Sequence, residues 1–243
     1  MITLIGTGHV FDLSNQIRRI LDEKQPDIIC VELDEKRYAG LMQKRNGTIN
    51  QASHQKNSSF LYQLLGRFQD SMAKQYGVHA GDEMLAGIQF AHDHQRPIAF
   101  IDVAADRMFQ RMIKEMSITE KMRLFFSAFA GLFISKKQVD KQINNLESNL
   151  ETYLEEVGKK FPTVKRVLID ERNNHMVQQL QKANEEYENL VAIVGDGHIP
   201  GLQSLLEKEN EPVESIRLKD LRAQKMTPEN MSNASFSVEY NGL

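Results

Sequence analysis

Cysteine is almost absent from this chain, and so are the usual marks of export. Cys30 is the only cysteine among the 243 residues, so no disulfide can form within the chain, and we expect a reducing compartment. It stands inside an apolar run, which favours a small buried side chain over a nucleophile. The sequence does not open with the pattern of a secretory signal, which consists of a basic segment, an apolar segment and a cleavage site. We therefore expect a cytoplasmic protein.

Long apolar runs and an excess of basic charge are lacking as well. The most apolar stretch, residues 124–134, is well short of the roughly 20 residues that a membrane-spanning helix needs. Lys and Arg number 30 against 33 Asp and Glu, so no broad basic field is available for nucleic acid. No G-x-S-x-G elbow, P-loop or H-E-x-x-H motif occurs. These absences argue against a membrane span, a nucleic-acid partner and the commonest hydrolase classes.

What the chain does contain is one short motif used twice. Gly6-Thr7-Gly8-His9 follows the apolar run 2–5, and Gly195-Asp196-Gly197-His198 follows the apolar run 190–194. Each run is typical of a strand buried on both faces, and glycine permits a sharp exit where the backbone approaches a ligand. Ligands of open α/β sheets bind beyond the carboxyl ends of the strands. We therefore expect the two imidazoles to meet at one end of a sheet.

Further strands are predicted by the apolar runs 27–33 and 98–103 and, as a more polar edge strand, by 213–218. Helical patterns separate these strands, and such an order indicates crossover connections. The predicted fold class is α/β, with a mostly parallel sheet flanked by helices on both faces. A length of 243 residues suits one domain spanning residues 1–243.

A helical hairpin is predicted as an insertion at about residues 105–160. Ser117 and Glu120 have the spacing of a capping box and open a helix rich in phenylalanine. Apolar residues from Val139 to Val157 recur at heptad spacing and predict a second helix. Three heptads are too few to indicate a coiled-coil dimer, so a homo-oligomer is left open. If the hairpin overhangs the sheet end, it could serve as a lid.

Acidic residues are expected beside the paired histidines. Glu32 and Asp102 each close a strand-like run, so both should lie at the same sheet end as His9 and His198. Imidazoles with carboxylates suit a divalent transition metal that keeps an open position for water. Alternatively, Glu32 simply marks a solvated strand end. Arg37 could pair with Glu32 or bind an anionic group of a substrate.

Two other carboxylates interrupt helical patterns. Glu83 opens a helix whose stripe continues with Gly87 and other small residues, so this helix should pack close to the sheet and bring Glu83 near the strand ends. A carboxylate at a helix N-terminus is also favourable to the helix dipole. Glu171 and His175 fall on one apolar helical face, and inward polar groups need partners. His175 is either a further ligand or a surface residue.

Taken in chain order, these residues resemble the TraB family, grouped with the pheromone-shutdown protein PrgY and the Wnt-inactivating Tiki proteins. The matching pieces cover residues 1 to about 202 and comprise residues 6–10, residues 31–34 with Arg37, residues 81–84, Glu171-Arg172 with Met176, and residues 194–198 with Gly201. The resemblance implies an α/β fold related to erythromycin-esterase-like proteins. Asn173 departs from the pattern, because many relatives carry an acidic residue there.

Tiki proteins are regarded as metal-dependent proteases, so the resemblance implies a metal set of His9, Glu32 and His198. The metal would be a divalent ion such as Mn, Co or Zn.

The same resemblance implies Glu83 and Glu171 as a general base or additional ligand. It also implies Arg37 and Arg172 as groups that bind the substrate or stabilise an oxyanion.

The leading hypothesis is a metal-dependent, peptidase-like hydrolase that cleaves an amide bond in a peptide or small-molecule substrate. A second hypothesis is a metal-independent, esterase-like hydrolase in which a histidine oriented by Glu32 serves as general base. A third is a non-catalytic protein that sequesters a peptide, as pheromone shutdown would allow. Metal dependence and the fate of the ligand distinguish the three.

Overall fold

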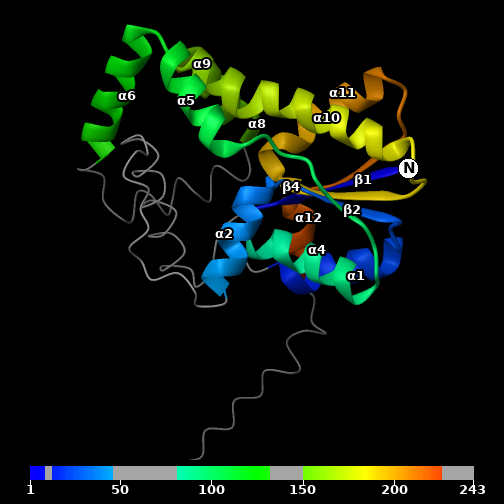
Figure 1. Cartoon of the computed structure of the whole chain (residues 1–243). Helices are drawn as coiled ribbons and strands as arrows, with labels where there is room; N and C mark the ends of the chain where they lie inside the picture. The colour runs from blue at the N-terminus through cyan, green and yellow to red at the C-terminus, as the bar shows by residue number, and fades with distance from the viewer. Residues whose placement is uncertain (9–12, 46–80, 132–149, 226–243) are drawn as a thin grey trace, which may run out of the picture.

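A five-stranded, all-parallel sheet forms the centre of the computed structural model, which describes residues 1–8, 13–45, 81–131 and 150–225 (Figure 1). The strand order within these residues is β3-β2-β4-β1-β5. The strands are β1 (Ile2–Thr7), β2 (Ile28–Val31), β3 (Ile98–Phe100), β4 (Leu190–Gly195) and β5 (Val213–Ile216). The predicted parallel α/β fold is therefore confirmed.

Helices cover both faces of this sheet, as expected. Helices α1 and α4, with α12, pack on one face, and α10 and α11 pack on the other (Figure 1). The described helices are α1 (Ser14–Lys24), α2 (Glu35–Arg45), α4 (Asp82–Asp93), α5 (Ala105–Glu115), α6 (Ile118–Gly131), α8 (Leu150–Lys160), α9 (Pro162–Lys165), the π-helix η1 (Arg166–Asp170), α10 (Glu171–Asn184), the 3-10 turn η2 (Asp196–His198), α11 (Ile199–Lys208) and α12 (Leu218–Lys225).

Side chains of the central strands alternate between two apolar cores. On β4, Val191 and Ile193 join the core under α1 and α4, whereas Ala192 and Val194 join the core under α10 and α11. Because both faces are covered, apolar residues are favoured at nearly every position of such a strand, and this explains the apolar runs in the sequence. Cys30 belongs to the second core, where burial raises the pKa of its thiol to about 12.

Both edges of the sheet are less buried than its centre. The predicted edge strand is β5, and its position is confirmed. The run 98–103 was expected to be a fully buried strand, but β3 covers only Ile98–Phe100, is half-buried and forms the other edge. Beyond it, Ile101 N still donates to Val31 O and Asp102 N to Leu33 O, so the chain continues to follow β2. Asp102 is thereby carried to the carboxyl end of the sheet.

The two glycine-histidine motifs follow neighbouring strands. Strands β1 and β4 pair in parallel, and Thr7 lies opposite Gly195 in the register. The described beginnings of the two motifs therefore lie side by side at the carboxyl end of the sheet, as the sequence predicted. His9 lies outside the described residues.

Helix α4 packs closely on the sheet, which confirms the prediction from its small residues. A Cβ atom on Gly87 would lie 2.2 Å from Cδ1 of Ile193, so the helix could not approach as closely with a larger residue. Glu83, in the first turn of α4, is buried. A helix that crosses between parallel strands runs antiparallel to them, so this first turn lies toward the carboxyl ends of the strands.

Helices α5, α6 and α8 lie within the region predicted as an insertion, and the short helix α9 follows it before α10 (Figure 1). The predicted capping box is confirmed: Glu120 N donates to Ser117 Oγ over 3.2 Å, and Ser117 N donates to Glu120 Oε2 over 3.0 Å. Thr163 also donates to Glu120 through its amide and its hydroxyl. The first half of the predicted heptad helix, including Val139, lies outside the described residues; the hairpin and its role as a lid stay predictions.

Candidate functional site

Glu32 is the centre of a polar network at the carboxyl end of the sheet. It follows β2 and is 6% exposed. Gly195 N donates to its Oε2 over 2.6 Å, Arg172 Nη2 donates to its Oε1, and His198 Nε2 lies 3.4 Å from the same Oε1. Burial opposes a charge on this carboxyl, but His198, Arg172 and the Gly195 amide outweigh it and hold the pKa of Glu32 well below its usual range. Glu32 is thus a buried, ionised carboxylate.

His198 is buried in the turn that follows β4, and each of its ring nitrogens faces a polar atom. Its Nδ1 lies 2.7 Å from Oδ1 of the buried Asn173, while Nε2 faces Glu32. An amide oxygen only accepts hydrogen bonds, so this contact puts a proton on Nδ1. Gly201 makes the contact possible, because a Cβ atom there would lie 2.1 Å from Asn173 Nδ2.

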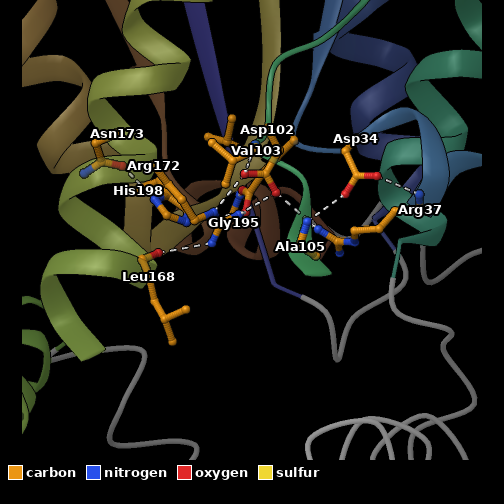
Figure 2. Close-up of polar contacts among 12 residues, drawn as sticks. Asp34, Arg37, Asp102, Val103, Ala105, Leu168, Arg172, Asn173, Gly195 and His198 are labelled. Atoms are coloured by element: carbon orange, nitrogen blue, oxygen red, sulfur yellow. Dashed lines mark hydrogen bonds and ion pairs between the residues drawn. The ribbon is translucent and has the colours of Figure 1, made fainter. Parts of the chain in front are cut away.

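Arg172 joins Glu32 to a second buried carboxylate. Its Nε and Nη2 donate to Oδ1 and Oδ2 of Asp102, each over 2.9 Å, and its Nη1 donates to Leu168 O over 3.2 Å. Arg37 reaches the other side of Asp102, with Nη1 3.3 Å from Oδ2. Burial disfavours the Arg172 charge, but the carboxylates of Glu32 and Asp102 more than compensate and raise its pKa. Figure 2 shows Asp102 lying between these two arginines.

Asp34 fixes the wall of the site next to Arg37. Its Oδ1 accepts the backbone N–H of Arg37 in α2, over 3.0 Å, and its Oδ2 accepts that of Ala105 in α5, over 3.3 Å. One carboxylate therefore caps two helices at once (Figure 2).

Asp196, within the second glycine-histidine motif, has a structural position. Arg217 Nε and Nη2 donate to its two oxygens, each over 2.9 Å, and Leu218 N donates to Oδ1 over 2.8 Å. A Cβ atom on Gly6 would lie 2.3 Å from that Oδ1. Asp196 of the second motif thus links the end of β4 to α12. This link requires a glycine at position 6, in the first motif, because a side chain there would collide with Asp196.

The other predicted site residues take different positions. Glu171 is half-buried and pairs with Arg111 and Arg166, and no contact with Glu32 or His198 joins it to the network among the described residues. Glu83 is buried in the first turn of α4. Within the described part of the chain, no group of three or more His, Cys, Asp and Glu side chains is arranged to hold a metal ion.

The inward face of α10 differs from the sequence expectation. Glu171 and His175 were expected on the apolar face, but both are only half-buried, whereas Asn173 points inward with Met176. The π-helix Arg166–Asp170 explains the shift, since its i→i+5 bonding widens one turn and changes the phase of all later residues.

A cleft of about 840 Å³ borders the network, and we call it the α5–α10 cleft. Asp102 and Arg172 line it where it meets the network. Its remaining lining residues are Asp34, Glu35, Lys36, Phe100, Val103, Ala104, Arg107, Met108, Arg111, Val167, Glu171, Asn174, His175 and Gln178. Groups on a bound molecule could therefore reach the arginine that holds Glu32.

Sequence reasoning missed two members of the network. Asp102 was expected at the sheet end but was not assigned to the site, and its position right after a strand was the available signal. Asn173 was noted only as a departure from an acidic pattern. No spacing in the chain indicates its contact with His198, because the two residues lie on different elements.

Fold and site together define a parallel α/β protein with a buried His–Glu–Arg–Asp network where the central strands end. Residues 1–214 match the model of the TraB/PrgY/gumN family, and the chain belongs to this family.

Curated relatives include an uncharacterised protein of Methanocaldococcus jannaschii, 30% identical over 85% of this chain and 53% of the relative. TraB domain-containing proteins of Bos taurus and Homo sapiens are 25% and 24% identical, each over 83% of this chain and 61% of the relative. The chain thus spans between half and two thirds of these relatives' length. Among its described helices, none combines the length and apolar content that a bilayer crossing requires.

Proposed function

We propose that this protein is a metal-dependent hydrolase of peptide-like amide bonds, with Glu32, His198 and His9 as metal ligands. The observation that carries the proposal is the orientation of His198: Nδ1 faces the oxygen of Asn173, so Nε2 is directed at the ionised Glu32. Metal-binding histidines commonly donate their second ring N–H to such an oxygen, which fixes the tautomer.

The spacing of the two donor atoms also supports the proposal. A lone pair on Nε2 would repel the Glu32 carboxylate, so a proton or a cation has to lie between them. Two ligands of one tetrahedral zinc ion, each about 2.0–2.2 Å from it, are separated by about 3.4 Å. His198 Nε2 and Glu32 Oε1 are 3.4 Å apart. Strand β1, which neighbours β4, leads into the first motif, and the proposal takes His9 of this motif as a third ligand.

Residues of the chain have separate roles in this proposal. Asn173 orients His198, and Gly195 N–H holds Glu32 in place. A bound metal would supply an activated water and polarise the substrate carbonyl. Arg172 borders both Glu32 and the α5–α10 cleft, so its guanidinium is placed to stabilise negative charge that develops on a substrate oxygen.

A metal-independent hydrolase is the second candidate, and one contact favours it. Arg172 already neutralises Glu32 through Oε1, the oxygen nearest to His198. If a proton lies between His198 and Glu32, the pair can exchange it with a substrate or water without a metal.

The test is cleavage of a defined peptide mixture, followed by mass spectrometry. Full-length protein is treated with a chelator, and Mn²⁺, Co²⁺ or Zn²⁺ is then restored. The proposal predicts that activity returns with metal and is lost in Glu32→Gln and His198→Ala but not in His92→Ala, which removes an exposed histidine at the end of α4.

Other outcomes discriminate among the alternatives. Cleavage that resists the chelator but needs His198 would support the metal-independent hydrolase. A peptide that binds stoichiometrically and is recovered intact under all metal conditions would contradict hydrolysis and favour a sequestering protein.

A further inference from the structure

We propose that the α5–α10 cleft binds the carboxylate of an acidic peptide, with Arg107 as its principal partner. The inference rests on the proposed hydrolase function for the choice of a peptide, and it adds the substrate's charge. Ligand sites in proteins commonly measure about 300–1,000 Å³, and the cleft, at about 840 Å³, lies in this range.

Two helices, α5 and α10, contribute most of the polar lining of the cleft. From α5 the lining residues are Arg107, Met108 and Arg111, and from α10 they are Glu171, Asn174, His175 and Gln178. Residues three, four and seven positions apart share one face of a helix, so each helix presents a continuous surface. Apolar side chains, including Phe100 and Val167, complete the lining. An extended peptide with both polar and apolar side chains matches this mixed lining.

Three of the four carboxylates in this lining, those of Asp34, Asp102 and Glu171, already have donors. Asp34 accepts two backbone N–H groups, and Asp102 accepts both Arg172 and Arg37. Glu171 is paired with Arg111. These acceptors therefore have little capacity left for a cation.

Unused donor capacity lies instead on the α5 and α10 residues of the lining. The side chains of Arg107, Asn174, His175 and Gln178 form no hydrogen bond or close ion pair with another residue in the part of the chain that the structure describes. Asp106, which attracts Arg107 at longer range, is already paired with Lys36. Glu35 also lacks such a partner there, but it is exposed to solvent in the first turn of α2. A guanidinium binds a carboxylate through two parallel hydrogen bonds, and side-chain amides match peptide groups.

A ligand held in this way would lie beside the network. Arg172 and Asp102 belong both to the cleft and to the contacts around Glu32. A carboxylate on Arg107 would anchor one part of a peptide while another part reaches Arg172.

The experiment measures retention of peptides by the full-length protein, with a chelator present so that metal-dependent cleavage does not interfere. Three equimolar sets of N-acetylated pentapeptides of Ala, Leu and Ser are used as probes. The first has a central Glu and an amidated end, the second a central Gln and an amidated end, and the third a central Gln and a free carboxyl end. Ultrafiltration and mass spectrometry report the retained fraction.

We expect at least one carboxylate set to be retained about tenfold more than the neutral set, because a hydrogen bond between two charged groups is stronger than one between neutral groups. The first and third sets show whether a side chain or a chain end is recognised. Arg107→Gln should remove the preference, whereas Lys114→Gln, with the same charge change on an exposed α5 position outside the cleft, should keep it.

Equal retention of the three sets, retention of none, or an unchanged preference in Arg107→Gln would overturn the inference. Because the readout is binding, a protein that retains acidic peptides but never cleaves them would contradict the proposed hydrolase and leave the acidic-peptide site in place.

Discussion

Asn173 Oδ1 lies 2.7 Å from His198 Nδ1, and this contact between α10 and the turn after β4 sets the direction in which the imidazole faces. It explains why a buried amide stands on the inner side of α10 among apolar residues. It also requires Gly201, the residue that lets Asn173 approach.

Removal of this orienting oxygen tests its role. In Asn173→Ala, His198 loses its partner at Nδ1, and we expect metal affinity to fall about 10–100-fold, as is usual when such outer partners are removed. Competition with a chromophoric chelator gives the affinity. Asn174→Ala is the matched control, because this neighbouring amide is exposed. Equal affinity in the two variants would mean that Asn173 does not support a metal ligand.

Gly6 is predicted to be intolerant of a side chain. In Gly6→Ala the new Cβ would meet Asp196 Oδ1 at 2.3 Å and disturb the Arg217 pair, so we expect a loss of about 1–3 kcal/mol in the free energy of unfolding. Urea denaturation measures it. Gly40→Ala in α2 is the control: nothing lies within 4 Å of its Cβ, and it should gain about 0.5–1 kcal/mol. Similar effects in both would refute the close-approach argument.

Arg172 is predicted to be essential for stability as well as for the site. Arg172→Met would leave the buried carboxylates of Glu32 and Asp102 without their shared cation, which costs about 3–5 kcal/mol. Arg18→Met breaks an exposed pair with Asp93 and should cost less than about 1 kcal/mol. Urea denaturation compares the two. If both losses were small, Arg172 would not be the cation that compensates these carboxylates.

Glu120 is predicted to make stability depend on pH. Burial opposes its charge, but hydrogen bonds from Ser117 and Thr163 outweigh this effect and lower its pKa in the folded protein. A carboxyl with a lowered folded pKa stabilises the protein above its unfolded pKa of about 4.3, and this stabilisation disappears as pH falls through the folded value. At pH 7 Glu120→Gln should therefore cost about 1 kcal/mol, as other cap losses do.

The measurement for Glu120 is the difference in unfolding free energy between the wild type and Glu120→Gln as a function of pH. The difference should shrink only below about pH 4.3. A difference that is constant from pH 7 down to pH 3 would contradict a role for the charge.

The fold could be predicted because its signals are local. Continuous apolar runs indicate strands covered on both faces, and the paired motifs after 2–5 and 190–194 indicate where two of these strands end. The contact between Glu32 and His198 could be predicted because the carboxyl ends of parallel strands lie at the same end of a sheet.

The rest of the site depends on contacts that spacing does not encode. The π-helix changes the helical phase between Val164 and His175. A regular α-helical period therefore predicts that Glu171 faces inward, whereas Asn173 faces inward in the structure. The shared role of Arg172 arises from three separate elements, β2, the segment after β3 and α10. Only the packed chain brings them together.

Metal content tests the central claim most directly. Full-length protein purified without an affinity tag is measured by elemental analysis as wild type, His9→Ala, His198→Ala and the control His92→Ala. The account predicts about one divalent metal ion per chain in the wild type and the control, and loss of the metal in both other variants. A wild type that stays free of metal after Mn²⁺, Co²⁺ and Zn²⁺ are offered, or a His198→Ala variant that keeps its metal, would contradict it.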